Sequence, residues 1–126
     1  MQNPLPPCPG TPNCERESRP FPGQSPKGLF EKAQDALGDL GPGRFTLRDD
    51  ERRVDAVFRV ALIFKDDVSV AVTPGANNDG GAVLHIRSAS RVGKSDFGVN
   101  RRRVRRFFRA LENATWKAQR AASATS

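Results

Sequence analysis

The stretch VDAVFRVALIFKDDVSVAVT, residues 54–73, decides the fold. Over residues 54–65 an apolar side chain stands at every second position, which is the pattern of a strand that buries one face. The polar letters KDD at residues 65–67 are predicted to turn the chain, and the alternation resumes at Val68. Two strands joined by so short a connection are expected to pair antiparallel.

Two further strands are predicted, one on either side of this stretch. Phe45 and Leu47 alternate with polar residues before it, and residues 83–90 alternate after the glycine-rich loop at residues 74–81. Four consecutive strands with short connections favour an antiparallel meander.

Two amphipathic helices are expected to flank the strands. Apolar side chains recur at helical spacing from Leu29 to Leu40, with Ser25 as the N-cap and Pro26 in the first helical position. The second helix is predicted to have Asn100 as its N-cap, and its apolar stripe comprises Val104, Phe107, Phe108, Leu111, Ala114, Thr115 and Ala118. The expected fold is therefore a two-layer α+β fold of order α-β-β-β-β-α. It has a four-stranded antiparallel meander, with an N-terminal and a C-terminal helix on one face.

The length of 126 residues suits one domain. Residues 1–26 hold eight of the ten prolines, so they are expected to form an extended arm, either laid over the domain or loose. Residues 27–120 are expected to form the single α+β domain, and residues 121–126 a flexible tail. No apolar run reaches the roughly 20 residues of a membrane span, so no transmembrane segment is predicted. The N-terminus lacks the features of a signal peptide, which predicts a cytoplasmic protein.

Two cysteines, Cys8 and Cys14, lie within the arm. If they are joined, they close a small ring that contributes about 2 kcal/mol through loop entropy. If they are reduced, they supply two of the four ligands that zinc needs, and His85 is the only other soft candidate. The sequence therefore predicts no metal site, and it predicts no cofactor.

The net charge of +7 lies entirely in residues 101–120, which hold eight basic groups and one acid. Such a localised surplus attracts anions, either an anionic small molecule or an acidic macromolecule. The alternative is a solvated helix face that only keeps the protein in solution. Nucleic acid is not favoured, because the chain has no recognition motif, no tyrosine and a single aromatic residue, Trp116, among the arginines of this helix.

Residues 87–103, RSASRVGKSDFGVNRRR, connect the last predicted strand to the second helix. Three arginines in a first helical turn are each disfavoured by roughly 0.3–1 kcal/mol, because the helix dipole is positive there. A bound anion would relieve this repulsion. The expected anion-binding residues are Arg87, Arg91, Lys94, Asn100, Arg101 and Arg103. The structural alternative is that Asp96 bridges the arginines while Asn100 caps the helix.

Two other functions remain open at this point. The same segment contributes Ser88, Ser90, Ser95 and Asp96 to a polar cluster that Asp66 and Asp67 could join. An enzyme of the hydrolase type would use Asp66, Asp67 and Asp96 as paired carboxylates. A structural or assembly protein would instead use Trp116 and the arginine face as its contact surface, and the oligomeric state is not predicted.

Three motifs resemble one known family. CPGTPNC at residues 8–14 resembles its CPxSPNC opening, FKDDV at residues 64–68 its FxDDV turn, and residues 87–103 its RSxSRxGxSDxGxNRxR signature. The chain is therefore identified as a member of the domain-of-unknown-function family 1499 (DUF1499), from about Cys8 to Leu111. The resemblance implies no activity. Many members look exported, lipid-anchored or lumenal, which implies an oxidised cysteine pair and makes export the alternative to a cytoplasmic location.

Overall fold

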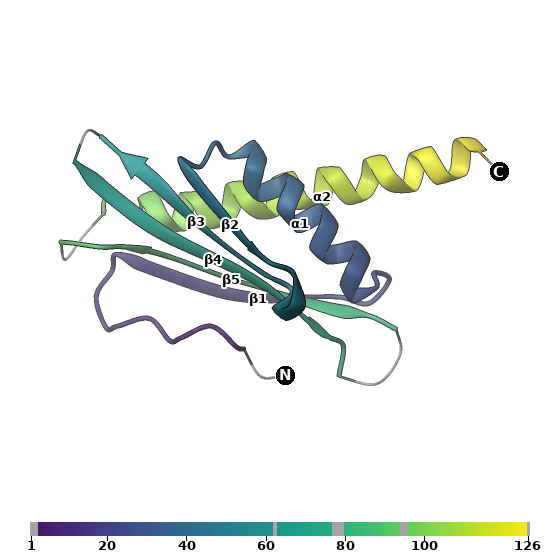
Figure 1. The fold of residues 1–126 in the computed structure, drawn as a ribbon, viewed down its shortest axis with the longest axis horizontal. Helices are drawn as coiled ribbons and strands as arrows, with labels where there is room; N and C mark the ends of the chain where they lie inside the picture. The colour runs from purple at the N-terminus through teal and green to yellow at the C-terminus, as the bar shows by residue number, and fades with distance from the viewer. Residues whose placement is uncertain (1–2, 62, 77–79, 94–95, 126) are drawn as a thin grey trace.

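The computed structural model describes residues 3–61, 63–76, 80–93 and 96–125, and its side chains as far as residue 114. The chain forms a five-stranded sheet and two long helices (Figure 1). In chain order the elements are β1 (Cys14–Phe21), α1 (Pro26–Asp39), β2 (Arg44–Arg48), the 3-10 turn η1 (Asp49–Glu51), β3 (Arg53–Val60), β4 (Phe64–Pro74), β5 (Ala82–Ser90) and α2 (Val99–Thr125). Helix α2 thus continues over residues 121–125, where a tail was expected.

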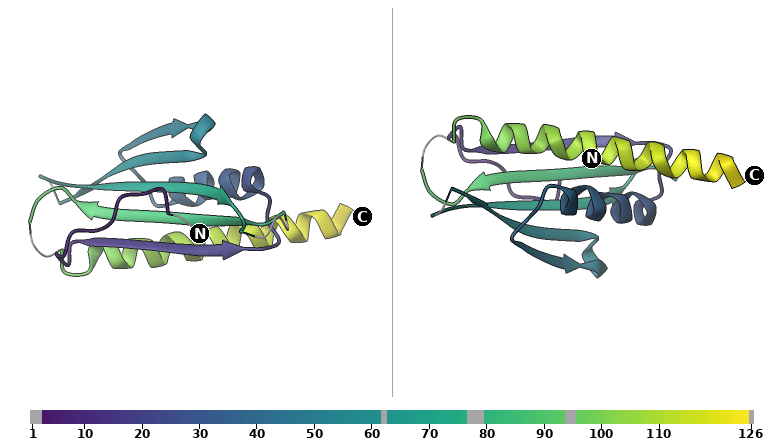
Figure 2. Two further views of the ribbon diagram at one scale, coloured as in Figure 1. Left: turned by 90° about the horizontal axis from the view of Figure 1, so that it is seen from below. Right: turned by 90° about the horizontal axis from the view of Figure 1, so that it is seen from above.

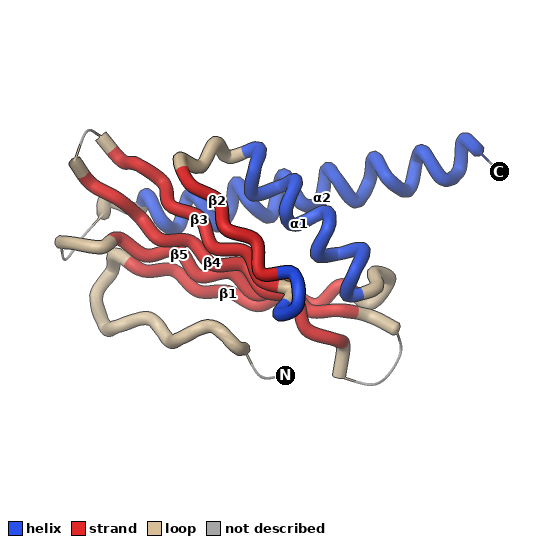
Figure 3. Tube along the Cα trace, in the orientation of Figure 1, coloured by secondary structure: helices blue, strands red, loops and turns tan. Residues whose placement is uncertain are grey.

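All strands pair antiparallel in the order β1-β5-β4-β3-β2, and both helices cover one face of the sheet (Figures 2 and 3). The two-layer α+β class and the meander from β2 to β5 are confirmed. The prediction of four strands is wrong, because β1 pairs with β5 along its whole length, from Cys14 opposite Ala89 to Phe21 opposite Ala82. Strand β1 reads CERESRPF, so it has no apolar alternation to reveal it, and as an edge strand it tolerates Pro20.

The turn predicted at residues 65–67 is also wrong. Strand β3 ends at Val60 and β4 begins at Phe64, so the chain reverses between these two residues and both aspartates lie inside β4. Ala61 takes a positive φ of 55° at this turn. Charged side chains within a strand are tolerated where a partner neutralises them, and both Asp66 and Asp67 have an arginine partner here.

The core lies between the sheet and the two helices. Ser25 accepts a hydrogen bond from the backbone N–H of Gly28, at 3.0 Å, so its predicted role as the N-cap of α1 is confirmed. The helical residues that pack on the sheet are Leu29, Phe30, Ala33, Ala36, Leu37, Val104, Phe107, Phe108 and Leu111, all buried. The expected apolar stripes are confirmed for these residues, whereas the side chains of Thr115, Trp116 and Ala118 lie outside the described ones.

Strand β1 occupies residues 14–21 of the expected arm, so the name N-terminal arm is kept for residues 3–13. This arm lies across the outer face of the sheet, which is the face opposite the helices (Figures 1 and 2). Leu5 is buried, and the guanidinium of Arg16 donates a hydrogen bond to its carbonyl oxygen at 3.0 Å. Asn3 donates another to the hydroxyl of Ser18 at 3.0 Å. The arm is therefore laid over the domain, next to β1.

Candidate functional site

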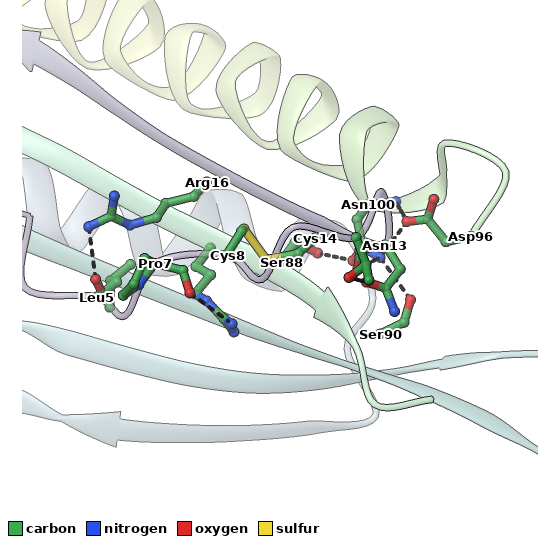
Figure 4. Close-up of a disulfide and its surroundings, with 12 residues drawn as sticks. Leu5, Pro7, Cys8, Asn13, Cys14, Arg16, Ser88, Ser90, Asp96 and Asn100 are labelled. Atoms are coloured by element: carbon green, nitrogen blue, oxygen red, sulfur yellow. Dashed lines mark hydrogen bonds between the residues drawn. A yellow bond between two sulfur atoms is a disulfide. The ribbon is translucent and has the colours of Figure 1, made fainter. Parts of the chain in front are cut away.

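Asn100 is the centre of a hydrogen-bond network where β5, the arm and α2 meet (Figure 4). Its side chain is buried, and its Oδ1 accepts from the hydroxyl of Ser88 at 2.6 Å and from Arg103 at 2.9 Å. Its Nδ2 donates to the carbonyl oxygen of Asn13 at 3.1 Å and to the hydroxyl of Ser90 at 2.9 Å. One amide thus ties the arm and the sheet to the start of α2.

Arg103 turns toward the sheet, although it belongs to the first turns of a surface helix. Its Nη1 lies 2.8 Å from Oδ2 of Asp66, and both side chains are buried. The guanidinium also lies over the ring of Phe58, 4.7 Å from the centroid. A buried charge requires such a partner, because an isolated ion is strongly disfavoured away from water. The pair therefore anchors α2 to β4.

Asp96 supplies the negative charge that the helix N-terminus needs. Its carboxylate accepts hydrogen bonds from the backbone N–H groups of Gly98, at 2.8 Å, and of Asn100, at 2.9 Å. The prediction of Asn100 as N-cap is therefore wrong: Asn100 lies inside α2, and its side chain points to the sheet instead. Partial burial acts to raise the pKa of Asp96, but hydrogen bonds from Asn100 and Gly98 outweigh it and hold that pKa below its ordinary value.

The three aspartates of the hydrolase alternative all have structural partners. Asp66 pairs with Arg103, Asp96 accepts from the helix backbone, and Asp67 binds Arg91 through two hydrogen bonds of 2.9 Å. Asp66 and Asp96 do line one hollow of about 250 Å³. An acid–base catalyst needs a carboxyl group that changes protonation near the working pH. The structural partners of all three aspartates, together with the lowered pKa of Asp96, do not favour this alternative.

A second concavity has the opposite character, and we call it the basic cavity. Its volume is about 170 Å³, and it is lined by Gly43, Arg44, Val57, Arg59, Lys65 and Arg91. Val57 alternates along β3 with the core residues Ala56 and Phe58, so the basic cavity opens on the outer face of the sheet. Four cations from three strands and the loop after β5 therefore converge at one end of that face.

The charges of the basic cavity are poorly compensated within the described chain. Arg59 lies directly opposite Lys65 in the β3–β4 register, and like charges in that relation destabilise a sheet. Asp67 neutralises Arg91, but no described carboxylate forms an ion pair with Arg44, Arg59 or Lys65. By contrast, Arg48 and Arg53 share the carboxylate of Asp55, and the Nε of each arginine lies 3.0 Å from one of its oxygens. An anion in the basic cavity would relieve this repulsion.

The expected anion-binding residues are thus distributed over different places. Arg91 lines the basic cavity, whereas Arg103 and Asn100 belong to the closed network around α2. Arg101 is exposed on α2. Arg87 lies next to the arm, because its Nη2 donates to the carbonyl oxygen of Pro7 at 3.5 Å, and its Nε is buried without a hydrogen-bond partner in the described structure. Lys94 and Ser95 lie outside the described residues.

Sequence reasoning missed Arg44, Arg59 and Lys65. Charges summed over residues 27–100 cancel, which concealed a local basic cluster. The turn predicted at residues 65–67 also placed Lys65 outside the strand, so that its position opposite Arg59 was not predicted. A hairpin that pairs Val60 with Phe64 would have placed Arg59 opposite Lys65 and revealed the unfavourable pair.

His85 and the cysteines have structural surroundings. His85 is fully buried, with Nδ1 2.7 Å from the hydroxyl of Ser18 and Nε2 2.8 Å from that of Thr73. Burial, and secondarily the charge of Arg16, lowers the pKa of His85. Cys8 and Cys14 form a disulfide, with an S–S distance of 2.06 Å (Figure 4). The described chain contains no group of three or more His, Cys, Asp or Glu side chains able to hold a metal ion.

The lowered pKa of His85 predicts a loss of stability in mild acid. The unfolded chain takes up a proton near the ordinary histidine pKa of 6.5, before the folded chain does. The contribution of neutral His85 to the free energy of unfolding is therefore complete above pH 6.5, and it declines as the pH falls from 6.5 toward the lowered pKa. Urea unfolding at several pH values should show this slope in the native chain and a flatter one in His85→Gln. Equal slopes would contradict this role of His85.

Together these features describe a two-layer α+β protein with a closed polar network and a separate basic cavity. A family model described as "Protein of unknown function (DUF1499)" matches residues 4–111, and the chain belongs to this family. A search of the curated proteins found no match. Neither helix, over the described residues, combines the length and apolar content that crossing a membrane requires.

Proposed function

We propose that this protein is a non-catalytic module that binds an anionic ligand, or an acidic group of a partner, in the basic cavity. The observation that carries the proposal is the convergence of Arg44, Arg59, Lys65 and Arg91 with only one described carboxylate among them, that of Asp67. Arg91 comes from the segment in which the sequence predicted an anion site. The other expected residues, Arg87, Lys94, Asn100, Arg101 and Arg103, are not part of this proposed site.

The size of the basic cavity favours a small anionic group. Pockets for drug-sized ligands have about 300–1,000 Å³, whereas this one has about 170 Å³. Guanidinium groups bind phosphate and carboxylate oxygens through paired hydrogen bonds, and the lysine adds a point charge. We therefore propose a phosphate group as the preferred occupant.

The test is calorimetric titration with inorganic phosphate and pyrophosphate at low ionic strength. The double variant Arg59→Gln/Lys65→Gln should lower the affinity for pyrophosphate by about tenfold or more, since each exposed charge contributes up to roughly 1 kcal/mol. Because the two cations repel each other across the hairpin, we expect the same variant to unfold at an equal or higher urea concentration than the native chain.

The matched control is Arg105→Gln/Arg106→Gln, which removes the same charge from the exposed face of α2. This variant should bind pyrophosphate nearly as well as the native chain. An equal loss of affinity in both double variants would show attraction by net charge alone and contradict a site in the basic cavity. The absence of binding by the native chain would also overturn the proposal.

The compartment is part of the proposal as well. A disulfide persists in oxidising compartments and is rare in the cytosol. The Cys8–Cys14 disulfide therefore favours the exported alternative over the cytoplasmic one. Alkylation of free thiols in intact cells before lysis tests this, because two alkylated cysteines in the recovered protein would favour the cytoplasm.

A further inference from the structure

Four strongly exposed apolar side chains lie at the end of the molecule that also carries the basic cavity. Ile63 is 80%, Phe64 46%, Val92 60% and Phe97 89% exposed. Ile63 precedes β4 and Phe64 is its first residue, whereas Val92 and Phe97 lie in the connection from β5 to α2. Figures 1 and 2 show the end of β3, the end of β5 and the start of α2 at the same end of the molecule. We call these four residues the apolar tip.

The two halves of the apolar tip are held next to each other by the sheet. The backbone N–H of Arg91 donates to the carbonyl oxygen of Lys65 at 3.0 Å, which places Val92 beside Phe64. Phe64 and Phe97 line the same hollow of about 250 Å³. The apolar tip is therefore one surface built from two connections, and exposed apolar surfaces of this kind mark interaction sites.

Cations surround the apolar tip, whereas the described carboxylates near it accept hydrogen bonds from other parts of the protein. Lys65 and Arg91 of the basic cavity are immediate sequence neighbours of Phe64 and Val92, and Arg101 and Arg102 are exposed at the start of α2. The carboxylates at this end belong to Asp66, Asp67 and Asp96, and each one accepts hydrogen bonds described above. The surface thus combines protruding apolar groups with a positive border.

We infer that this end of the protein docks on the surface of an anionic lipid bilayer. In this arrangement a lipid phosphate occupies the basic cavity and the apolar tip enters the interface beneath the headgroups. The inference rests on the proposed function, because it identifies the bound anion as a lipid phosphate. A lipid surface fits better than a folded partner, because a bilayer interface offers apolar chains to the exposed side chains and phosphates to the cations beside them.

The experiment is sedimentation with vesicles of phosphatidylcholine alone and of phosphatidylcholine mixed with an equal amount of phosphatidylglycerol. The native chain should bind the anionic vesicles and leave the neutral ones. Ile63→Ser/Phe97→Ser should weaken that binding about tenfold or more, since burying each such side chain in an apolar phase is strongly favourable. Arg59→Gln/Lys65→Gln should weaken it about fivefold for each cation. Pyrophosphate affinity should be unchanged by the first variant and lowered about tenfold or more by the second.

Leu47→Ser is the matched control, because Leu47 is 47% exposed on the edge strand β2, away from the tip. It should bind anionic vesicles like the native chain. If Ile63→Ser/Phe97→Ser also does so, adsorption by charge alone explains the binding and the inference is wrong. Binding of pyrophosphate without binding of vesicles would overturn the inference and leave the proposed function in place. Binding of neither would overturn both.

Discussion

Replacing Arg103 with alanine should lower the free energy of unfolding by about 3–5 kcal/mol, the usual cost of leaving one partner of a buried ion pair alone. Asp66, which is 2% exposed, would keep its carboxylate away from water without a cation. The variant would also lose the contact of the guanidinium with the ring of Phe58. Urea unfolding followed by circular dichroism measures the loss, and a loss below 1 kcal/mol would contradict the role of the pair.

Two further variants separate the ion pair from general effects of removing an arginine. Arg101→Ala, in the same turn but exposed, should be neutral or stabilise by about 0.3–1 kcal/mol, because it removes a cation from a helix N-terminus. The double variant Arg103→Ala/Asp66→Ala should be less destabilised than the sum of the single variants, because the second substitution removes the unpaired charge. Additive effects would show that the two groups are not coupled.

Replacing Asn100 with alanine should lower the free energy of unfolding by about 2–4 kcal/mol, because it removes one hydrogen-bond partner from each of several buried polar groups. These include the carbonyl oxygen of Asn13, the hydroxyl of Ser88 and part of the guanidinium of Arg103. We also expect the arm to be held less firmly, because the variant loses the bond from Asn100 to Asn13 and, among the described residues, only the backbone N–H of Ser90 still donates to that carbonyl oxygen. Hydrogen exchange of the arm and of β5, measured beside urea unfolding, tests both effects.

The exposed Asn113 of the same helix offers the matched control. Asn113→Ala should stabilise slightly, because alanine has the higher helix propensity. Asn100→Asp keeps the acceptor oxygen for Ser88 and Arg103, but it places a second carboxylate against Asp96. At neutral pH it should therefore lower the free energy of unfolding about as much as Asn100→Ala does. If Asn100→Ala lowered the free energy of unfolding no more than Asn113→Ala, the hydrogen-bond network around Asn100 would not stabilise the fold.

Much of the fold could be predicted because apolar periodicity determines it. The strand pattern of β3, the N-cap at Ser25 and the buried stripe of α2 all follow from local spacing. Strand β1 could not be predicted in this way. Most of its residues are polar or charged, without an apolar alternation, and the strand exists because β5 offers an edge and the disulfide holds the arm beside it.

The candidate site was predictable only in its composition. The sequence shows that residues 87–103 are dense in arginine and serine, but not which side chains turn inward. Arg101 and Arg103 look equivalent in the sequence, yet one is exposed and the other buried. Long-range contacts with Asp66 make that difference, and no local rule contains them. The basic cavity likewise depends on strand register, which a one-residue slip would destroy.

The central claim is that the basic cavity, and not the start of α2, receives the anion. Backbone amide NMR during titration with inorganic phosphate tests it most directly. The account predicts that the largest shifts occur at Gly43, Arg44, Arg59, Lys65 and Arg91, while Gly98, Asn100 and Arg103 stay nearly unchanged. Shifts concentrated at residues 98–103 would contradict the account and return the anion site to the helix terminus.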